Sequence, residues 1–316
     1  MDQTKGVPLM EIFNIFLNII VPILILIGIG AFLHFKFQLD LNTLAKINIY
    51  YLVPGLIFIR LYETDLAWDL FFKVLAFFIF LSISLYFVSN IISRLFSFSK
   101  GLRIAFSHST LFYNSGNYGI SVNDLAFRQD PVAMGVQVLV LTFQNLLVYS
   151  YGIISLDKLN KTKIKNTVPY FKMPILYAMF FGLLLNAFNL ELPQFIYIPG
   201  SYIADALIAV ALLTLGAQVV QLNFTKNMFT VYLSVAVRLI ISPLTAFIII
   251  PFLHVDVITA QALFIASAVP SSVNSAIIAQ EYENEAAFAA QAVFVSTIFS
   301  ALSITIVIFL SRILFT

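Results

Sequence analysis

The sequence contains no cysteine and very little charge. Of its 316 residues, 10% are charged and 61% are hydrophobic. A typical soluble domain has roughly 25% charged and about 45–50% apolar residues. Without cysteine there can be no disulfide, no thiolate metal site and no cysteine nucleophile. With so little charge the chain cannot cover a water-soluble surface, which excludes a cytosolic enzyme and a disordered chain.

Several catalytic and binding motifs are also missing. The chain has no His-Glu-x-x-His, no Gly-x-Ser-x-Gly and no Walker-type phosphate loop, which weakens the case for an intramembrane hydrolase or an ATPase. A net charge of +2 gives no signal for nucleic acid. We therefore expect a protein that is not an enzyme, with no metal site, no cofactor and no nucleic-acid partner. Any active transport would have to use an ion gradient or an attached partner.

Long hydrophobic runs dominate what is present. One transmembrane helix needs about 20 apolar residues, and continuous runs favour helices over an alternating β-barrel. The first run, 12–33, is too long for a signal-peptide core, so we expect a retained helix. The sequence predicts an all-α polytopic membrane protein with ten transmembrane helices. They are expected at 10–33, 41–61, 70–93, 102–127, 131–155, 173–190, 200–221, 228–252, 257–281 and 286–313.

Basic residues give the predicted spans an orientation. Five Lys and Arg residues fall on the side of the termini and eleven on the other side. The positive-inside rule places both termini outside and the Lys-rich loop 156–172 in the cytoplasm. We expect a multi-pass protein of the plasma membrane. The loop is either a solvated topology signal, which we prefer, or a binding surface for anionic lipid or a partner.

The same loop divides the chain into two sets of five spans. Residues 1–155 form the first five-helix repeat and residues 173–316 the second, which must run inverted because five is odd. The fourth span of each set is interrupted in mid-run, at 114–119 and at 270–274. Interruptions at matching places in two halves are the best sequence pointer to a transporter binding site.

The interruptions have a physical meaning. Hydrocarbon cannot satisfy free backbone groups, so a helix can break in a membrane only inside protein or beside water. The half-helix after each break begins with unpaired N–H groups and a partial positive charge. Two such starts facing each other would attract a carboxylate. The alternative is that Gly and Asn merely allow close packing or a kink.

These segments resemble the auxin efflux carrier family, which includes plant PIN-formed carriers and bacterial malonate or malate permeases. Asn114 and Gly119 match its first interruption, although Ser121 stands where the family has proline. Proline presets a helix start, whereas serine can cap one. The other matching segments are Phe143-Gln144-Asn145, Leu215-Gly216-Ala217-Gln218, Arg238 to Pro243, Val269 to Ser275 and Ala279-Gln280-Glu281-Tyr282.

The resemblance implies a fold and a mechanism. It implies ten helices in two inverted repeats, with helices 4 and 9 broken and crossing at mid-membrane. Helices 1, 2, 6 and 7 would form a scaffold, often dimeric, and helices 3–5 and 8–10 a moving transport domain. An elevator-like movement would expose the site to each side in turn. The implied substrate is a small organic anion such as malate or malonate.

We therefore predict a secondary carrier for a small organic anion, in contact with membrane lipids and coupled to a proton or sodium gradient or running as a uniport. A non-transporting receptor or sensor with the same pocket, and a channel, remain alternatives. The predicted substrate-binding residues are Asn114, Gly116, Asn117, Ser121, Gln144, Pro270, Ser271, Ser272 and Asn274.

Five of the charged residues within or beside predicted spans are candidates for a specific role. Asp69 and Lys73 are four apart and share a helix face; they form either a vestibule, as the resemblance implies, or an ordinary interfacial ion pair. Asp124 is either a coupling-ion site or a solvated carboxylate, and Asp205 has the same two readings. Arg238 lies well inside the eighth span and needs water, a carboxylate or carbonyls as partners, with a structural partner preferred over a ligand.

Overall fold

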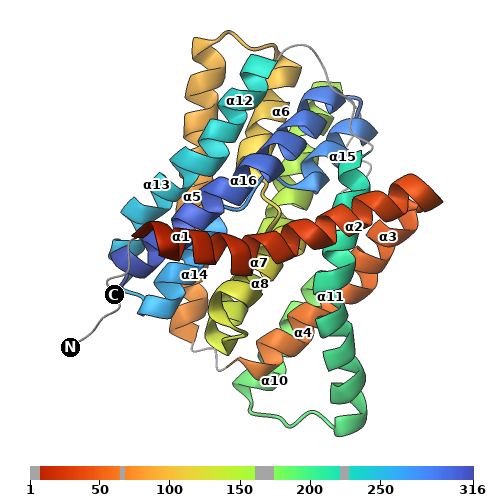
Figure 1. Ribbon diagram of the computed structural model, residues 1–316, viewed down its shortest axis with the longest axis vertical. Helices are drawn as coiled ribbons and strands as arrows, with labels where there is room; N and C mark the ends of the chain where they lie inside the picture. The colour runs from red at the N-terminus through yellow and green to blue at the C-terminus, as the bar shows by residue number, and fades with distance from the viewer. Residues whose placement is uncertain (1–7, 65–67, 161–173, 221–227) are drawn as a thin grey trace.

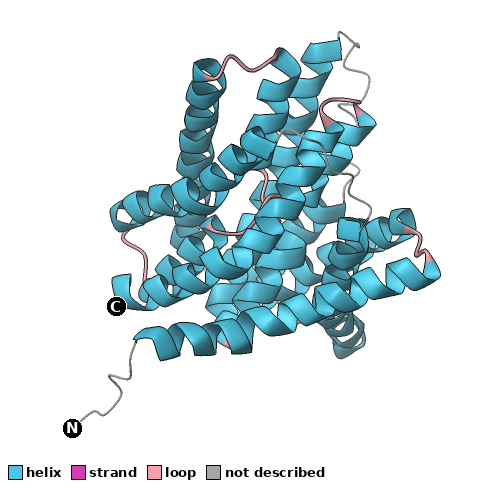
Figure 2. Cartoon of the chain, turned by 45° about the horizontal axis from the view of Figure 1, so that its top comes forward, coloured by secondary structure: helices cyan, strands magenta, loops and turns pink. Residues whose placement is uncertain are grey.

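The computed structural model describes residues 8–64, 68–160, 174–220 and 228–316, and these residues are almost entirely helical (Figures 1 and 2). The helices are α1 (Pro8–Ile15), η1 (Phe16–Ile20), α2 (Val21–Phe37), α3 (Leu41–Ile47), η2 (Asn48–Leu52), α4 (Val53–Glu63), α5 (Trp68–Leu95), α6 (Lys100–Leu111), η3 (Ser115–Ile120), α7 (Ser121–Phe127), α8 (Pro131–Leu147), η4 (Val148–Gly152), α9 (Ile153–Asn160), α10 (Pro174–Ala187), α11 (Gln194–Val220), α12 (Met228–Ala236), η6 (Val237–Ile241), α13 (Ser242–Ile249), η7 (Ile250–Leu253), α14 (Val257–Ser267), α15 (Val273–Glu281) and α16 (Ala286–Leu314).

Seven continuous segments within the described residues are long and apolar enough to cross a bilayer. They are Pro8–Phe37, Leu41–Glu63, Trp68–Leu95, Pro131–Leu156, Gln194–Val220, Met228–Leu253 and Ala286–Leu314. The other three predicted spans are the two interrupted ones, 102–127 and 257–281, and the sixth, where the described helix α10 has 14 residues. The all-helical class is therefore confirmed for the described residues. The ten crossings and the inverted repeat stay predictions. Of the predicted loop 156–172, residues 156–160 belong to α9, and the rest lies outside the described residues.

Three of the long segments contain a widened turn directly before a proline. The turns η1, η2 and η6 end one residue before the dipeptides Val21-Pro22, Val53-Pro54 and Ser242-Pro243. Proline lacks a backbone N–H and clashes with the carbonyl four residues earlier. A single π-helical turn relieves that clash and lets the helix continue.

Helices α2, α4, α10 and α11, which we call the first panel, pack closely through glycines. A Cβ added to Gly30 would collide with the carbonyl oxygen of Leu213, and one added to Gly216 with that of Ile27. Gly182 of α10 likewise lies against the backbone of Phe58 in α4. Small residues allow helix backbones to approach closely inside a membrane, so these glycines fix the contacts of α2 with α11 and of α4 with α10.

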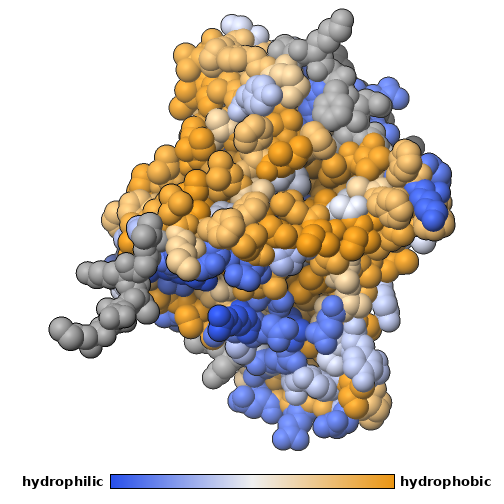
Figure 3. Space-filling view, in the orientation of Figure 1, coloured by the Kyte–Doolittle hydropathy of each residue, from blue (hydrophilic) through white to orange (hydrophobic). Residues whose placement is uncertain are grey.

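The second panel consists of α5–α8, α12–α16 and the turns between them, and it lies beside the first panel (Figure 1). Helix α1 contacts α16, and Glu11 lies 3.5 Å from Arg312, so the first and last helices of the described chain meet. Large apolar side chains such as Phe32, Phe80 and Phe87 are exposed. Figure 3 shows an apolar surface over most of one face, with hydrophilic residues gathered toward one end and at one tip. Such a surface fits contact with lipid rather than water.

Candidate functional site

The first interruption follows α6. After Leu111, Phe112 has an extended backbone, and the chain becomes helical again only at Ser115. The side chain of Asn114 caps this second start, because its Oδ1 accepts a hydrogen bond of 3.2 Å from the N–H of Asn117. An Asn at this position is a preferred helix cap. The run Asn114 to Gly119 thus ends one helix and begins another.

The second interruption follows α14 and has a different cause. Pro270 has no N–H to continue a helix and disfavours helical geometry at the preceding Val269. Ser272 then caps α15, with its Oγ accepting a hydrogen bond of 3.2 Å from the N–H of Asn274. The two interruptions therefore place two capped helix starts, η3 and α15, in the interior.

The interruptions are joined to each other by backbone pairing. Tyr113 and Ser271 form an antiparallel bridge. The N–H of Asn114 donates to the carbonyl of Pro270, and the N–H of Ser272 donates to that of Phe112, both at 2.8 Å. We call this pairing the junction. It satisfies four backbone groups that would otherwise be unpaired away from water.

The carbonyls that end α6 also have partners. His108 accepts from the N–H of Phe112, and Ser109 from the hydroxyl of Ser271. The carbonyl of Thr110 accepts from the guanidinium of Arg238, and the carbonyl of Leu111 from the amide of Gln144. The side-chain partners come from the segment before α15, from η6 and from α8. The end of α6 therefore joins three elements.

Arg238 serves both helix ends at once. It is fully buried, and besides Thr110 it donates to the carbonyl of Ser267 at the end of α14 and to the hydroxyl of Ser242. Its guanidinium carbon lies 4.5 Å from the centre of the Tyr113 ring. Among the described residues no carboxylate pairs with it. Its partners are thus the negative ends of two helices, which confirms the structural role expected for it.

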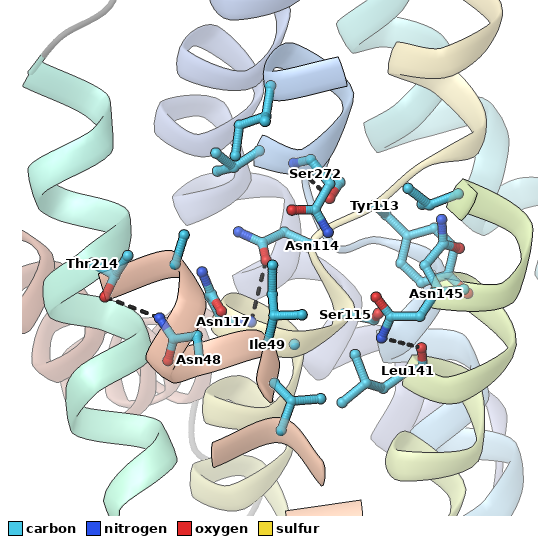
Figure 4. Close-up of a pocket in the computed structure, with 18 of the residues that line it drawn as sticks. Asn48, Ile49, Tyr113, Asn114, Ser115, Asn117, Leu141, Asn145, Thr214 and Ser272 are labelled. Carbon is cyan, nitrogen blue, oxygen red and sulfur yellow. Dashed lines mark hydrogen bonds between the residues drawn. The ribbon is translucent and has the colours of Figure 1, made fainter. Parts of the chain in front are cut away.

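A cavity opens on the other side of the junction, between the two panels (Figure 4). It holds about 670 Å³ of empty space, its open mouth included. The first panel and the adjoining α3–η2 segment contribute Ala45, Asn48, Ile49, Val53, Ile175, Thr214 and Gln218. The second panel contributes Tyr113 to Asn117, Leu141, Gln144, Asn145, Val148, Ser272 to Asn274 and Ile277.

The cavity wall is polar but uncharged. None of the described lining residues carries a charge. Buried polar atoms without a described partner gather here: Oδ1 of Asn48, Oη of Tyr113, Nδ2 of Asn114, Oε1 of Gln144 and Oε1 of Gln218. No described group accepts a hydrogen bond from the backbone N–H of Gly116 or of Val273. Unpaired polar groups of this kind are rare in protein interiors and call for an explanation.

Six of the nine predicted binding residues line this cavity, and three do not. Asn114, Gly116, Asn117, Gln144, Ser272 and Asn274 line it. Ser121 instead bonds the carbonyl of Asn117, Pro270 accepts from Asn114, and Ser271 bonds Ser109. Pro270 and Ser271 belong to the junction, and Ser121 is the first residue of α7. None of the three forms part of the cavity wall.

Sequence reasoning did not predict six of the polar lining residues as part of the site, namely Asn48, Tyr113, Ser115, Asn145, Thr214 and Gln218. Asn48 and Thr214 are bonded to each other at 3.0 Å, although 166 residues separate them. A polar residue in mid-span was the available signal for Asn48. Asn145 and Gln218 belong to segments that carry the family resemblance, but nothing local marked them as wall residues.

The other predicted charges lie away from the cavity. Asp69 and Lys73 form the expected ion pair, at 2.7 Å, and Lys73 also donates to the carbonyl of His254. Neither lines the cavity, and a vestibule role stays a prediction. Asp205 pairs with Arg60 at 2.8 Å. Asp124 is half-buried on α7, where Arg60 and Asp205 act on it electrostatically.

The chain is also similar to known proteins. Residues 15–308 match the model of a family described as membrane transport protein. The chain belongs to that family. It is also 26% identical over 128 residues to an uncharacterized transporter of Methanocaldococcus jannaschii, and the match spans 40% of each chain.

Family membership confirms the resemblance to the auxin efflux carriers that the sequence motifs indicated. Together with the apolar helices, it identifies a multi-pass membrane protein. Membership fixes neither the substrate nor the mechanism. Those depend on the cavity and on the helices that surround it.

Proposed function

We propose that the protein is a secondary carrier for a small organic anion, bound in the cavity beside the junction. One observation carries the proposal: the starts of η3 and α15 both lie at an uncharged cavity, where the donors Nδ2 of Asn114 and the hydroxyl of Tyr113 have no described partner. Helix starts favour negative charge. A carboxylate would accept hydrogen bonds from the N–H of Gly116 and of Val273 and from the side chain of Asn114.

The arrangement of the panels supports alternating access. The cavity takes part of its wall from each panel, so sliding one panel against the other would change the side to which it opens. We propose an elevator-type movement of α5–α8 and α12–α16 against α2, α4, α10 and α11. Ten crossings in two inverted repeats, with the junction at mid-membrane and a homodimer through the first panel, belong to this proposal.

A second, wider cavity indicates the side of the membrane to which the site opens. It holds about 1,470 Å³ including its open part, and it shares Ala45, Gln218, Val273 and Ile277 with the first. Its outer rim includes Leu41 and Gln280 at helix ends. In the orientation predicted from the basic residues these ends are cytoplasmic, so the site would open inward.

On the opposite side of the membrane from this wider cavity, the two panels are tightly packed. The hydroxyl oxygen of Thr64 lies 3.1 Å from the carbonyl oxygen of Pro131, and a Cβ on Gly135 would lie 2.6 Å from the Thr64 Cγ2. We propose that this contact between α4 and α8 is the closed outer gate. Plasma-membrane location, termini outside and coupling to a proton or sodium gradient complete the proposal. Asp124 is the coupling candidate.

Counterflow in proteoliposomes tests the function. Vesicles loaded with unlabelled malate, malonate or lactate should accumulate the labelled anion, and the uptake should saturate. Tight binding without flux under any gradient would indicate a receptor. Turnover of about 10⁶ ions per second or more would indicate a channel, because conformational steps take μs to ms.

Single cysteines test the state, and the absence of natural cysteine leaves no background. Ala45→Cys should react with a membrane-impermeant thiol reagent from the cytoplasmic face, and bound substrate should protect it. Thr64→Cys should not react from the outer face in the same preparation. The reverse pattern would overturn the inward-open assignment.

A further inference from the structure

Four side chains in the cavity wall carry a polar atom without a described partner, and in three of them a hydrogen bond to a neighbour fixes which atom that is. Asn48, Tyr113, Asn114 and Gln144 are 5%, 2%, 6% and 3% exposed, so all four side chains are buried. Each has one buried polar atom without a partner among the described residues. In Asn48, Asn114 and Gln144 the hydrogen bond of the other polar atom decides which role the unpaired atom can take.

In Asn48 the oxygen is the atom left unpaired. Its Nδ2 lies 3.0 Å from the hydroxyl of Thr214 (Figure 4). That hydroxyl gives its one hydrogen to the carbonyl of Val210 at 2.7 Å. Thr214 can therefore only accept from Asn48. The amide nitrogen of Asn48 is committed to that bond, and its Oδ1 is an unpaired acceptor.

Hydrogen bonds also fix the side chains of Gln144 and Asn114, but they leave an acceptor unpaired in Gln144 and a donor unpaired in Asn114. The Nε2 of Gln144 faces the carbonyl of Leu111, which can only accept, so Oε1 of Gln144 is a second unpaired acceptor. The Oδ1 of Asn114 faces the N–H of Asn117, which can only donate. Nδ2 of Asn114 is thus an unpaired donor, and the hydroxyl of Tyr113 can supply another.

A carboxylate accepts hydrogen bonds and donates none, so it can satisfy Asn114 and Tyr113 but neither amide oxygen. The acceptors Asn48 and Gln144 need a hydrogen-bond donor on the same ligand. Leaving a buried acceptor unpaired is costly, and a site built to bond a substrate donor strongly rejects an analogue without it. An uncharged wall also disfavours a second negative charge, which would be buried without a counter-charge.

We propose that the substrate is a singly charged carboxylate that also carries a hydrogen-bond donor. The donor is a hydroxyl, an N–H or the proton of a second carboxyl group. The carboxylate faces Asn114 and Tyr113, and the donor faces the amide oxygens of Asn48 and Gln144. This inference rests on the proposed carrier function. It excludes simple alkanoates and fully ionised dicarboxylates as preferred substrates.

Matched anions that differ by one hydroxyl test the proposal on the unaltered chain. Counterflow of lactate should exceed that of propanoate, and 3-hydroxybutanoate should exceed butanoate, by about tenfold or more in uptake at low concentration. Succinate uptake should rise as the pH falls and its monoanion becomes abundant, while lactate uptake should stay level over the same range.

Two variants assign the preference to its residues. Gln144→Met and Asn48→Leu keep side-chain volume and remove the acceptor, so the hydroxyl preference should fall to about twofold or less. Thr142→Val is the control, because Thr142 is buried on the same helix α8, bonds only the carbonyl of Val138 and does not line the cavity. It should keep the full preference.

The possible outcomes distinguish a failure of the donor requirement from a failure of the carrier function. Equal uptake of both members of each pair by the unaltered chain overturns the donor requirement and leaves the carrier function in place. A preference that survives in both Gln144→Met and Asn48→Leu overturns the assignment to these residues. No uptake of any of these anions, of malate or of malonate removes the carrier function itself.

Discussion

Helix ends lie on both sides of the junction, but their polar groups are paired on one side and unpaired on the other. On one side, the carbonyl ends of α6 and α14 are fully paired, with Arg238 donating to both. On the other side, the starts of η3 and α15 lie beside unpaired donors and acceptors at an uncharged cavity. Tyr113 separates the two, with its ring against Arg238 and its residue in the cavity wall.

This contrast shows how a membrane protein can interrupt a helix without losing stability. Each broken helix exposes one negative and one positive end. The negative ends are neutralised permanently by a side chain of the protein. The positive ends lie where a mobile anion could bind and leave. A charge inside the junction is thus part of the fold, and the charge in the cavity would belong to the substrate.

Removing Arg238 should have the largest effect on the paired side. In Arg238→Met the carbonyl of Thr110 loses its partner and the two helix ends lose a cation, which we expect to cost about 2–5 kcal/mol of folding free energy. Thermal unfolding of the purified protein in detergent should show a much lower midpoint. Arg238→Lys, which keeps the charge but reaches fewer carbonyls, should lie between. A midpoint equal to that of the unaltered protein would show that Arg238 does not stabilise the paired side of the junction.

Asn114→Ala and Asn274→Ala should have the largest effect on the open side. We expect each to lower transport about tenfold, since one hydrogen bond to a charged group is worth about 1.5–3 kcal/mol. The unfolding midpoint should move little for Asn274→Ala, and somewhat more for Asn114→Ala because its helix cap is worth about 1 kcal/mol. If both variants transport like the unaltered protein, the junction is not the substrate site.

Two neighbouring serines give a sharper test, because they serve opposite sides. Ser271→Ala removes the hydroxyl that pairs with the carbonyl of Ser109, and Ser272→Ala removes the cap of α15 at the cavity. Both should cost about 1 kcal/mol of stability. Only Ser272→Ala should also raise the KM for the anion, by several-fold. Equal kinetic effects would mean that the two sides are not functionally distinct.

The smallest effect should come from the start of α14. Asp256 caps that helix through Thr259, at 3.0 Å to the N–H and 2.6 Å to the hydroxyl. Burial raises the pKa of Asp256, but these hydrogen bonds outweigh it and hold the pKa below its ordinary value. The carboxylate therefore stabilises the fold at neutral pH and loses that effect as the pH falls through the lowered pKa.

Asp256→Ala should accordingly lower the unfolding midpoint by the equivalent of about 1 kcal/mol at pH 7 and by less near pH 3. Transport per folded molecule should not change. A transport defect would show that this helix start is coupled to the cavity, contrary to the comparison.

Sequence patterns were sufficient for the helices and for the two interruptions. Apolar length predicted the long spans within a few residues, and Pro270 and the run from Asn114 to Gly119 marked the breaks. These features are local: bilayer thickness sets the length of a span, and a missing N–H or a capping amide acts within one turn. The resemblance to the auxin efflux carriers gave the family, which the comparison confirmed.

The cavity wall and the pairing of the junction were decided by tertiary structure alone. Asn48 meets Thr214, Arg238 meets Thr110, and Asn114 meets Pro270 across more than 120 residues in each case. Whether a serine faces the cavity or a carbonyl, as Ser272 and Ser271 do, depends on the partner that arrives from elsewhere in the chain. The sequence by itself determined where helices stop; only packing determined which of their ends are neutralised and which face a binding site, because a helix end acquires its partner in three dimensions.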